Sequence, residues 1–459
     1  MTSSAAESAT RMPTGKNGSQ RKELILRLAL NLLIFLSFFQ NGLTVLLNVK
    51  LRLIGFLILV VLFAKGLFSS QSPLRLFEKA MLVWFGTGVL SGLFDFRYGI
   101  NSQVAYSLAY NLIFEFGWIM AFFAGKYAGS QGVNFRKVMA WTLFFGIVLT
   151  GLAILEKFFH EYVELYLLAT SNNAFIQENF NSVFRRGYGY DESAYRCVSF
   201  VLEFISFSYL CGILTLAFLV LFLEFRKFWY LVGLITSVSA LFLTQSLASL
   251  AACCLCALLY LFVVKRMKIS HLIYVGLACG VFMTAFAFQK EGASPFEGIQ
   301  NRITSVASGK DEGLITHFHN FQFGVIDNFT AFGHGLGTAD FLHGQMARQM
   351  EDDEYPTIEH EYFRILFEVG GIGFLVYLFA IGLATKQSMI LYQRETDPWR
   401  KCIAVICALW LIEHLLVGFA HRAFPNYEST IFPALLFGFL YATTPTPLTK
   451  TAHIKLSED

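Results

Sequence analysis

Charge is scarce in this sequence. Only 15% of its 459 residues are Asp, Glu, Lys or Arg, whereas 55% are hydrophobic. The formal net charge of +3 is too small to indicate a nucleic-acid partner, which a strongly basic surface would attract. A soluble chain of this length would be expected to divide into two or three domains with dispersed apolar residues. The composition instead indicates long apolar segments.

Disulfide and metal-binding patterns are missing as well. The sequence has eight cysteines, and nearly all of them lie inside apolar blocks, with Cys197 at the edge of one. None lies within the long polar segments of the chain. Their spacing therefore gives no disulfide framework, no zinc motif and no haem attachment site.

Apolar runs long enough to cross a bilayer are plentiful, as judged by a window of about 20 residues. They predict an all-α fold: a polytopic integral membrane helical bundle of about 12 transmembrane helices, with membrane lipids around it. The expected spans lie near residues 24–47, 51–68, 77–94, 104–124, 137–155, 198–223, 228–244, 246–264, 270–289, 362–384, 402–420 and 428–443.

The distribution of Lys and Arg predicts the topology, because these residues accumulate in cytoplasmic loops. Basic residues recur on alternate connections, whereas Lys50 and Arg52 oppose this order. Both termini are therefore expected in the cytoplasm. The predicted organisation is a disordered cytoplasmic tail (1–22), a transmembrane domain (23–445) with extracytoplasmic loops at 156–197 and 290–360, and a second cytoplasmic tail (446–459).

Basic residues also occur in the two loops that this topology places outside, where they should be depleted. The first loop carries Arg185, Arg186 and Arg196, and the second carries Arg302 and Lys310. One interpretation is a solvated loop surface. The other is an anionic ligand, since guanidinium groups match phosphate oxygens in a bidentate manner.

The second outer loop is expected to contain short helices on the membrane surface. Its histidines His317 and His319 are two residues apart and would point to different sides of a helix, so no metal site is expected. The stretch GHGLGT, residues 333–338, reads as a flexible loop whose amides could hold an anion.

The stretch EHEYFRILFEVGGIGFLVYLF, residues 359–379, places ionisable residues at the start of an apolar run. His360, Arg364 and Glu368 are four residues apart, so on a helix they form one stripe that runs from the outer surface into the membrane. Such groups indicate a polar cavity that opens outward. We expect Arg364 and Glu368 to pair and His360, at the water interface, to accept a proton near neutral pH.

Three further ionisable residues fall within predicted spans: Glu203, Glu413 and His414. Together with Arg364 and Glu368, we interpret them as cavity-lining or structural groups. A transporter or lipid-carrier flippase would also place such groups in its spans, although the sequence shows neither two similar halves nor helices broken at matching positions. A non-catalytic assembly scaffold is a third possibility.

The order of these parts resembles the O-antigen ligase and O-antigen polymerase superfamily of bacterial surface-polysaccharide enzymes. The resemblance rests on Arg302, the SGK stretch that ends at Lys310, the GHGLGT loop, HEYF from His360 and the Glu-x-Gly-Gly-Ile-Gly stretch from Glu368. It is firmest over about residues 290 to 380. Two departures are Lys310, where the family often has Arg, and Glu361, where it often has Asn.

The resemblance implies a metal-independent glycosyltransferase of the bacterial inner membrane, with no soluble cofactor and an active site that faces the periplasm. Its donor would be a glycan on undecaprenyl diphosphate, and its acceptor a second glycan or a lipid. Arg196, Arg302 and Lys310 would bind the diphosphate, with Arg185 or Arg186 in reserve. His360 would be the catalytic base, with Glu361 or Glu359 orienting it or acting in its place.

Ligase and polymerase activities both remain open, because they differ only in acceptor: lipid A core for a ligase, and a carrier-linked repeat for a polymerase. Two separate basic clusters could hold two diphosphates, which slightly favours polymerisation. Other membrane proteins of polysaccharide assembly are expected as partners in either case.

Overall fold

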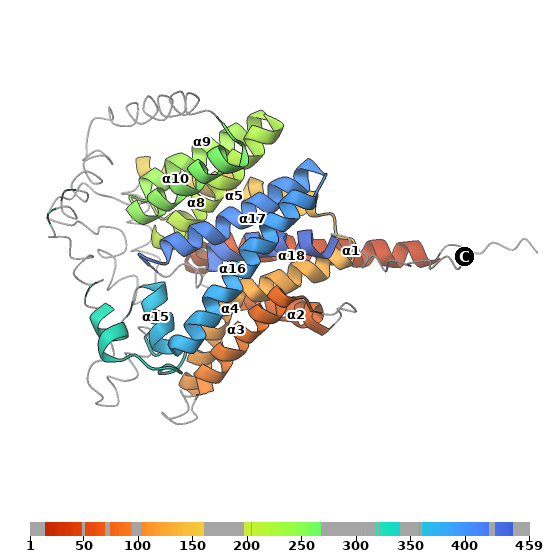
Figure 1. The fold of residues 1–459 in the computed structure, drawn as a ribbon. Helices are drawn as coiled ribbons and strands as arrows, with labels where there is room; N and C mark the ends of the chain where they lie inside the picture. Colours follow the sequence, from red (N-terminus) through yellow and green to blue (C-terminus); the bar gives the residue numbers. More distant parts are fainter. Residues whose placement is uncertain are drawn as a thin grey trace, which may run out of the picture.

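The computed structural model describes residues 14–47, 51–68, 74–93, 102–159, 197–202, 204–267, 304, 308, 318, 321–339, 358, 360–421 and 427–443. All the regular elements within these ranges are helices (Figure 1). The long helices are α1 (Thr14–Leu47), α2 (Leu51–Phe68), α3 (Leu76–Gly92), α4 (Ser102–Ser130), α5 (Phe135–Phe158), α8 (Phe204–Phe225), α9 (Phe228–Leu243), α10 (Leu247–Leu259), α16 (Gly370–Arg394), α17 (Pro398–Val417) and α18 (Tyr427–Thr443). The short ones are η2 (Ser199–Val201), η3 (Tyr260–Val264), η4 (Gln322–Asp327) and α15 (Glu361–Glu368).

Six of the described helices are long and apolar enough to cross a membrane, by length and composition. The predicted class, a helical polytopic membrane protein, is thereby confirmed. The number of about 12 spans stays a prediction, and the span expected near 270–289 lies outside the described residues. Helix α1 begins at Thr14, within the segment 1–22 that the sequence predicts to be a disordered tail.

Close helix packing depends on small residues. Helix α4 runs along α18, and its Gly125 and Gly129 stand in the four-residue spacing that lets helix backbones approach in membranes. A Cβ on Gly125 would collide with the backbone of Leu435, and one on Gly438 would collide with the backbone of Phe122. These glycines therefore make α4 and α18 a closely packed pair.

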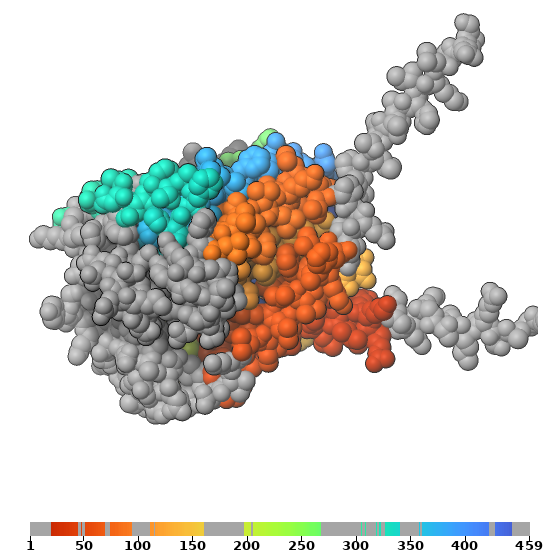
Figure 2. All heavy atoms as spheres, turned by 90° about the horizontal axis from the view of Figure 1, so that it is seen from below, coloured from red at the N-terminus to blue at the C-terminus, as the bar shows by residue number. Residues whose placement is uncertain are grey.

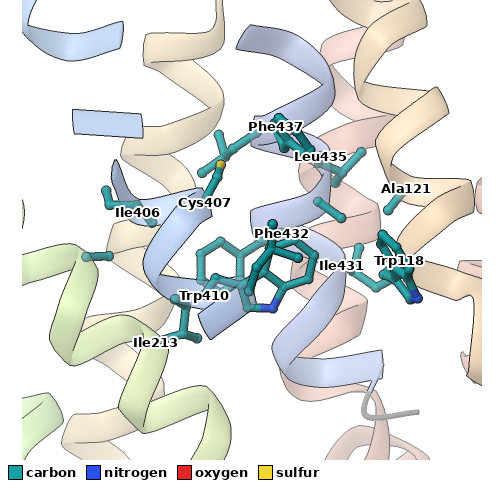
Figure 3. Packing of buried hydrophobic residues seen from close by; sticks show 14 of the residues in the cluster. Trp118, Ala121, Ile213, Ile406, Cys407, Trp410, Ile431, Phe432, Leu435 and Phe437 are labelled. Carbon is teal, nitrogen blue, oxygen red and sulfur yellow. The ribbon is translucent and has the colours of Figure 1, made fainter. Parts of the chain in front are cut away.

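Helices α4, α17 and α18 meet in the centre of the bundle. Trp118 of α4 and Trp410 of α17 are fully buried, with ring centroids 6.3 Å apart, and Phe432 of α18 lies beside them (Figure 3). Peripheral helices instead expose large apolar side chains, such as Leu57 on α2 and Leu375 on α16, which are 66% and 67% exposed. An apolar outer surface around a packed centre suits a protein surrounded by lipid.

Two ion pairs join helices at one end of the bundle. There Lys126 pairs with Glu78 at 2.5 Å, linking α4 to α3, and Arg136 pairs with Asp397 at 3.0 Å, linking the starts of α5 and α17. Helix α15 lies at the opposite end from the first turns of α1 (Figure 1), and segment 321–339 lies there as well (Figure 2). These two ion pairs thus lie at the end of the bundle away from α15, whereas the topology inferred from Lys and Arg stays a prediction.

Arg52, which opposed the charge rule, is neutralised at the α15 end. Its guanidinium donates to Asn41 Oδ1 at 2.7 Å and lies 3.8 Å from the buried carboxylate of Glu428, at the start of α18. Asn41 also donates to Glu428 Oε1, at 3.1 Å. This arginine therefore serves a local ion pair, which explains why it does not follow the loop statistics.

The span expected near residues 362–384 is present, but it begins later than predicted, at Gly370. The chain forms two helices there, α15 and α16, which are separated at Val369, and Gly370 is the first residue of α16. Gly370 has a φ of 80°, in the left-handed region that a residue with a side chain rarely adopts. The ionisable stripe consequently lies on a short helix of its own rather than at the head of a membrane span.

Candidate functional site

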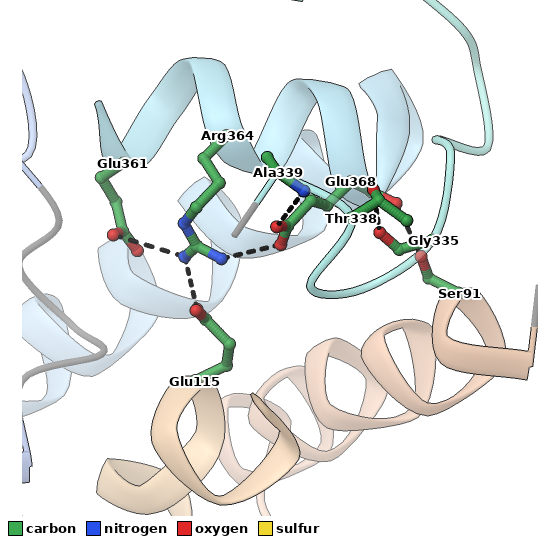
Figure 4. A network of polar contacts seen from close by, with 8 residues as sticks. All are labelled: Ser91, Glu115, Gly335, Thr338, Ala339, Glu361, Arg364 and Glu368. Carbon is green, nitrogen blue, oxygen red and sulfur yellow. Dashed lines mark hydrogen bonds and ion pairs between the residues drawn. The ribbon is translucent and has the colours of Figure 1, made fainter. Parts of the chain in front are cut away.

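Helix α15 carries the ionisable residues of the opening stretch. His360 precedes its first turn with extended backbone angles, and the His360 carbonyl accepts a hydrogen bond from the Arg364 amide at 2.9 Å. The helix ends where the Val369 amide donates to the Ile365 carbonyl, also at 2.9 Å. On this eight-residue helix, the side chains of Arg364 and Glu368 point toward α3 and α4 (Figure 4).

Arg364 is the centre of a buried ionic network. Its Nη2 donates to Glu115 Oε2 at 2.5 Å and lies 3.5 Å from Glu361 Oε2, while its Nη1 donates to Glu368 Oε2 at 2.7 Å (Figure 4). The Arg364 side chain is 2% exposed, and none of the three carboxylates exceeds 8%. The pair that the sequence predicted, Arg364 with Glu368, is present within this larger group.

The network holds more carboxylates than guanidinium groups. Glu115, Glu361 and Glu368 face the single positive charge of Arg364. Charges removed from water cost several kcal/mol each unless they are compensated. Such a site therefore favours additional positive charge, supplied by a proton or by a cationic group, near the start of α15.

Glu115 and Ser91 were not identified from the sequence. Glu115 is a single acidic residue within the apolar run NLIFEFGWIM of α4, and that isolation was the available signal. Ser91 is an ordinary residue near the end of α3, yet its Oγ donates to the Glu368 carbonyl at 2.6 Å. Both depend on contacts between distant parts of the chain.

The GHGLGT loop packs against the end of α15. The amides of His334 and Gly335 donate to the carbonyls of Phe367 and Glu368, at 2.9 and 3.0 Å, and the Gly333 amide donates to Thr330 Oγ1 at 2.8 Å. The hypothesis that this loop holds an anion is wrong for these three amides, because each already has an acceptor. The loop acts as a support for α15.

Glycine is favoured at three positions of this loop. Gly333, Gly335 and Gly337 have φ values of 78°, 122° and 87°. A Cβ on Gly333 would collide with the Glu368 carbonyl, and one on Gly337 would collide with the side-chain amide of Asn111 on α4. The loop also reaches the network directly, since the Ala339 amide donates to Glu368 Oε1 at 3.2 Å.

His360 is enclosed, being 5% exposed, and its ring centroid lies 4.7 Å from that of Phe363. The prediction of a water-interface position is wrong in this respect. His334, in contrast, helps to hold its loop in place, because its ring stacks on Phe367 and its Nε2 lies 2.9 Å from the Asn328 carbonyl oxygen. Glu361, 1% exposed, follows His360 directly and faces Arg364.

The predicted diphosphate-binding residues and one cavity residue lie outside the described part of the chain. The segment just after Arg196 is described: the Cys197 amide donates to the Leu243 carbonyl at 3.2 Å, and the Ser199 amide donates to Glu156 Oε2 at 2.6 Å. This segment therefore anchors on α5 and the end of α9. The residues not described are Arg185, Arg186, Arg196, Glu203, Arg302 and Lys310.

Glu413 and His414 form a second buried polar group, on α17. His414 Nε2 lies 3.2 Å from Ser429 Oγ of α18, and its Nδ1 lies 3.1 Å from the Trp410 carbonyl oxygen. The Glu413 carboxylate packs against Gly212 of α8. The structure places these residues with α8 and α18, whereas the Arg364 network joins α15, α4 and the GHGLGT loop.

Among the residues that the structure describes, no three His, Cys, Asp or Glu side chains gather in an arrangement that could hold a metal ion. Residues 232–378 match the family model of O-antigen ligase. No curated protein matches the chain. The matched segment includes α15, the GHGLGT loop and His360, so it covers most of the site, and it supports the resemblance to the O-antigen ligase and polymerase superfamily.

Proposed function

We propose that this chain, whose residues 232–378 match the O-antigen ligase family, moves or polymerises glycan from an undecaprenyl-diphosphate carrier. The match supports a membrane enzyme of polysaccharide assembly that transfers glycan. The carrier, the periplasmic location and the independence from metal belong to the proposal. One observation carries it: the matched segment contains α15, which His360 begins and a buried ionic network holds.

The chemistry requires a base, an electrophilic sugar carbon and a stabilised leaving group. An acceptor hydroxyl gives its proton to His360 and attacks the anomeric carbon of the donor. The bond from that carbon to the diphosphate oxygen breaks, and the lipid diphosphate leaves with the electron pair. Arg196, Arg302 and Lys310, with Arg185 or Arg186 in reserve, stabilise the negative charge that develops there, and side-chain cations thereby fill the role of a metal.

The position of His360 suits this role. His360 stands at the start of a helix whose other end is tied to the GHGLGT loop and to Ser91. A base on a fixed element can be aligned with a reacting hydroxyl, and alignment of this kind supplies much of a rate enhancement. Glu361 then orients the imidazole or replaces it as the base.

A transporter or lipid-carrier flippase is the alternative, and one observation favours it. Both carboxylate oxygens of Glu413 lack a hydrogen-bond partner among the described residues, although the side chain is fully buried. Intramembrane acids of this kind occur in proton-coupled transporters. A transporter would move the lipid-linked glycan unchanged, whereas the proposed enzyme releases undecaprenyl diphosphate.

The test uses the purified protein in lipid nanodiscs with an undecaprenyl-diphosphate-linked glycan as donor and a second such glycan as acceptor. Wild-type protein should release undecaprenyl diphosphate and lengthen the glycan, with the same turnover in the presence of a metal chelator. Arg196→Ala and Arg302→Ala should each abolish transfer. Arg196→Lys and Arg302→Lys should keep only part of the activity, because lysine contacts phosphate as a point charge. Arg136→Ala, at the opposite end of the bundle, is the matched control.

Full activity of both Ala variants would remove the diphosphate-binding role from these arginines. A wild-type protein that releases no lipid diphosphate with either a carrier-linked or a lipid A core acceptor would overturn the proposal. Polysaccharide from a deletion strain separates the two activities: loss of a ligase leaves long chains unattached, whereas loss of a polymerase leaves single repeats.

A further inference from the structure

The geometry points to Glu115 as a positioning residue for the glycan transfer proposed above. From α4, Glu115 holds Arg364 and thereby fixes α15, which carries Glu361 and begins at His360 (Figure 4). This inference rests on the proposed function. It gives a role to a residue of α4 that lies outside the segment matched to the family.

The contacts of Arg364 separate two kinds of partner. Glu361 and Glu368 lie on α15 itself, three positions before and four positions after Arg364. Ion pairs within one helix stabilise that helix but cannot fix where it lies. Glu115 comes from another helix and makes the shortest of the three contacts, 2.5 Å, in a site where both side chains are at least nine-tenths buried.

Helix α4 is a suitable anchor. The residues that follow Glu115 are packed in the core: Phe116 and Trp118 are at most 1% exposed. Nearly three turns further along (~2.8, at 3.6 residues per turn), Gly125 brings α4 against the backbone of α18. Functional groups held from rigid elements are placed more accurately than those held from loops, so the carboxylate of Glu115 is a fixed point.

Helix α15 needs such a point. An isolated helix of eight residues is not stable in itself, and the left-handed Gly370 separates it from α16. The GHGLGT loop and Ser91 bind the carbonyls of Phe367 and Glu368, at the C-terminal end. Nearer the N-terminal end, the Tyr362 hydroxyl donates to the Leu415 carbonyl and Arg364 contacts Glu115. Glu115 and the Leu415 carbonyl therefore anchor the half of the helix adjacent to His360, and of these two only Glu115 is a side chain.

The excess of carboxylates indicates that the length of the Glu115 side chain matters more than its negative charge. Glu361 and Glu368 already offset the positive charge of Arg364. A neutral side chain of the same length can still accept the hydrogen bond from Arg364 Nη2. A shorter carboxylate keeps the charge but leaves a gap of about one methylene, which α15 must close by moving.

This distinction gives a direct test with Glu115→Gln, Glu115→Asp and Glu115→Ala, assayed for transfer from an undecaprenyl-diphosphate-linked glycan. We expect kcat to fall less than about threefold in the Gln variant, about tenfold or more in the Asp variant and about a hundredfold in the Ala variant, since a misplacement of about 1 Å can cost a hundredfold in rate. KM for the donor should stay within about twofold, because Glu115 does not contact the donor.

Glu78 supplies the matched control. It is a buried glutamate that pairs with Lys126 at 2.5 Å at the opposite end of the bundle. Substitution of Glu78 by Gln, Asp or Ala should lower the melting temperature while the turnover of folded protein stays unchanged. Equal losses of kcat in the Glu78 and Glu115 series would show a general loss of stability and overturn the positioning role.

Two further results would overturn it: an Asp variant more active than the Gln variant, or a raised KM with unchanged kcat. A double-mutant cycle of Glu115→Ala and Arg364→Met, read as melting temperature, needs no activity and should be strongly non-additive. An additive cycle contradicts the contact itself. If the cycle is non-additive but the wild-type protein transfers no glycan, the contact between Glu115 and Arg364 stands and the proposed function is the part that fails.

Discussion

Replacement of Arg364 by Met should destabilise the protein more than the loss of any exposed ion pair. Methionine keeps much of the length of arginine but removes the guanidinium, so Glu115, Glu361 and Glu368 would face one another without a counter-charge. Removing one partner of a buried pair costs about 3–5 kcal/mol, because the remaining charge stays in a low-dielectric site. For a large domain we expect a fall in melting temperature of about 5 to 10 °C.

The assay is thermal unfolding of purified protein, followed by intrinsic fluorescence in the same lipid nanodiscs for each variant. The matched control is Arg136→Met, which removes the pair with Asp397. In that pair the side chains are 53% and 30% exposed, so solvent screens the interaction and the expected loss is at most about 1 kcal/mol. Equal melting temperatures for the two variants would refute the reasoning that the Arg364 network is held in a low-dielectric site.

Two other predictions concern topology and the loop beside the site. Reporter fusions after residues 175 and 330 should report the outer side and fusions after 132 and 267 the cytoplasm; a cytoplasmic signal at 330 would place His360 on the wrong side for lipid-linked glycan. Gly337→Ala should cost about 1–3 kcal/mol in unfolding experiments, because its φ of 87° is left-handed and a Cβ would meet Asn111. Gly151→Ala, in helix α5 where a Cβ would meet nothing within 4 Å, should be neutral or stabilising.

The membrane class of the protein and the pairing of Arg364 with Glu368 could be predicted from the sequence because both depend on local patterns. Apolar runs indicate spans, and a separation of four residues places two side chains on one helix face. The extent of the network could not be predicted. Glu115 is 249 residues from Arg364 in the chain, and only the packing of α4 brings the two together.

The break at Gly370 had a signal that the apolar pattern concealed. Two adjacent glycines in EVGGIG lie inside a run whose hydropathy fits one continuous span. Whether such a glycine pair bends a helix, breaks it or leaves it continuous depends on which other part of the chain packs against it. Here the amides of Gly371 and Ile372 donate to the carbonyls of Thr330 and Ala331, at 3.0 and 3.1 Å, and residues so distant in sequence leave no local trace.

The GHGLGT loop shows the same limit. Its glycines suggested free amides and an anion site, since glycine-rich turns often expose their N–H groups. Three of these amides donate within the protein instead, and Gly333 and Gly337 are needed because Glu368 and Asn111 approach closely. A sequence pattern cannot tell a turn that admits a ligand from a turn that admits another part of the chain.

The most direct test of the central claim is the turnover of His360→Ala with an undecaprenyl-diphosphate-linked glycan donor. The proposed role predicts a protein that folds, inserts and binds the donor like the wild type but transfers glycan more slowly by a factor of about 100 to 10,000, the range for loss of one acid–base group. Near-normal turnover of this variant would contradict His360 as the base and shift the search to Glu359, Glu361 or His317.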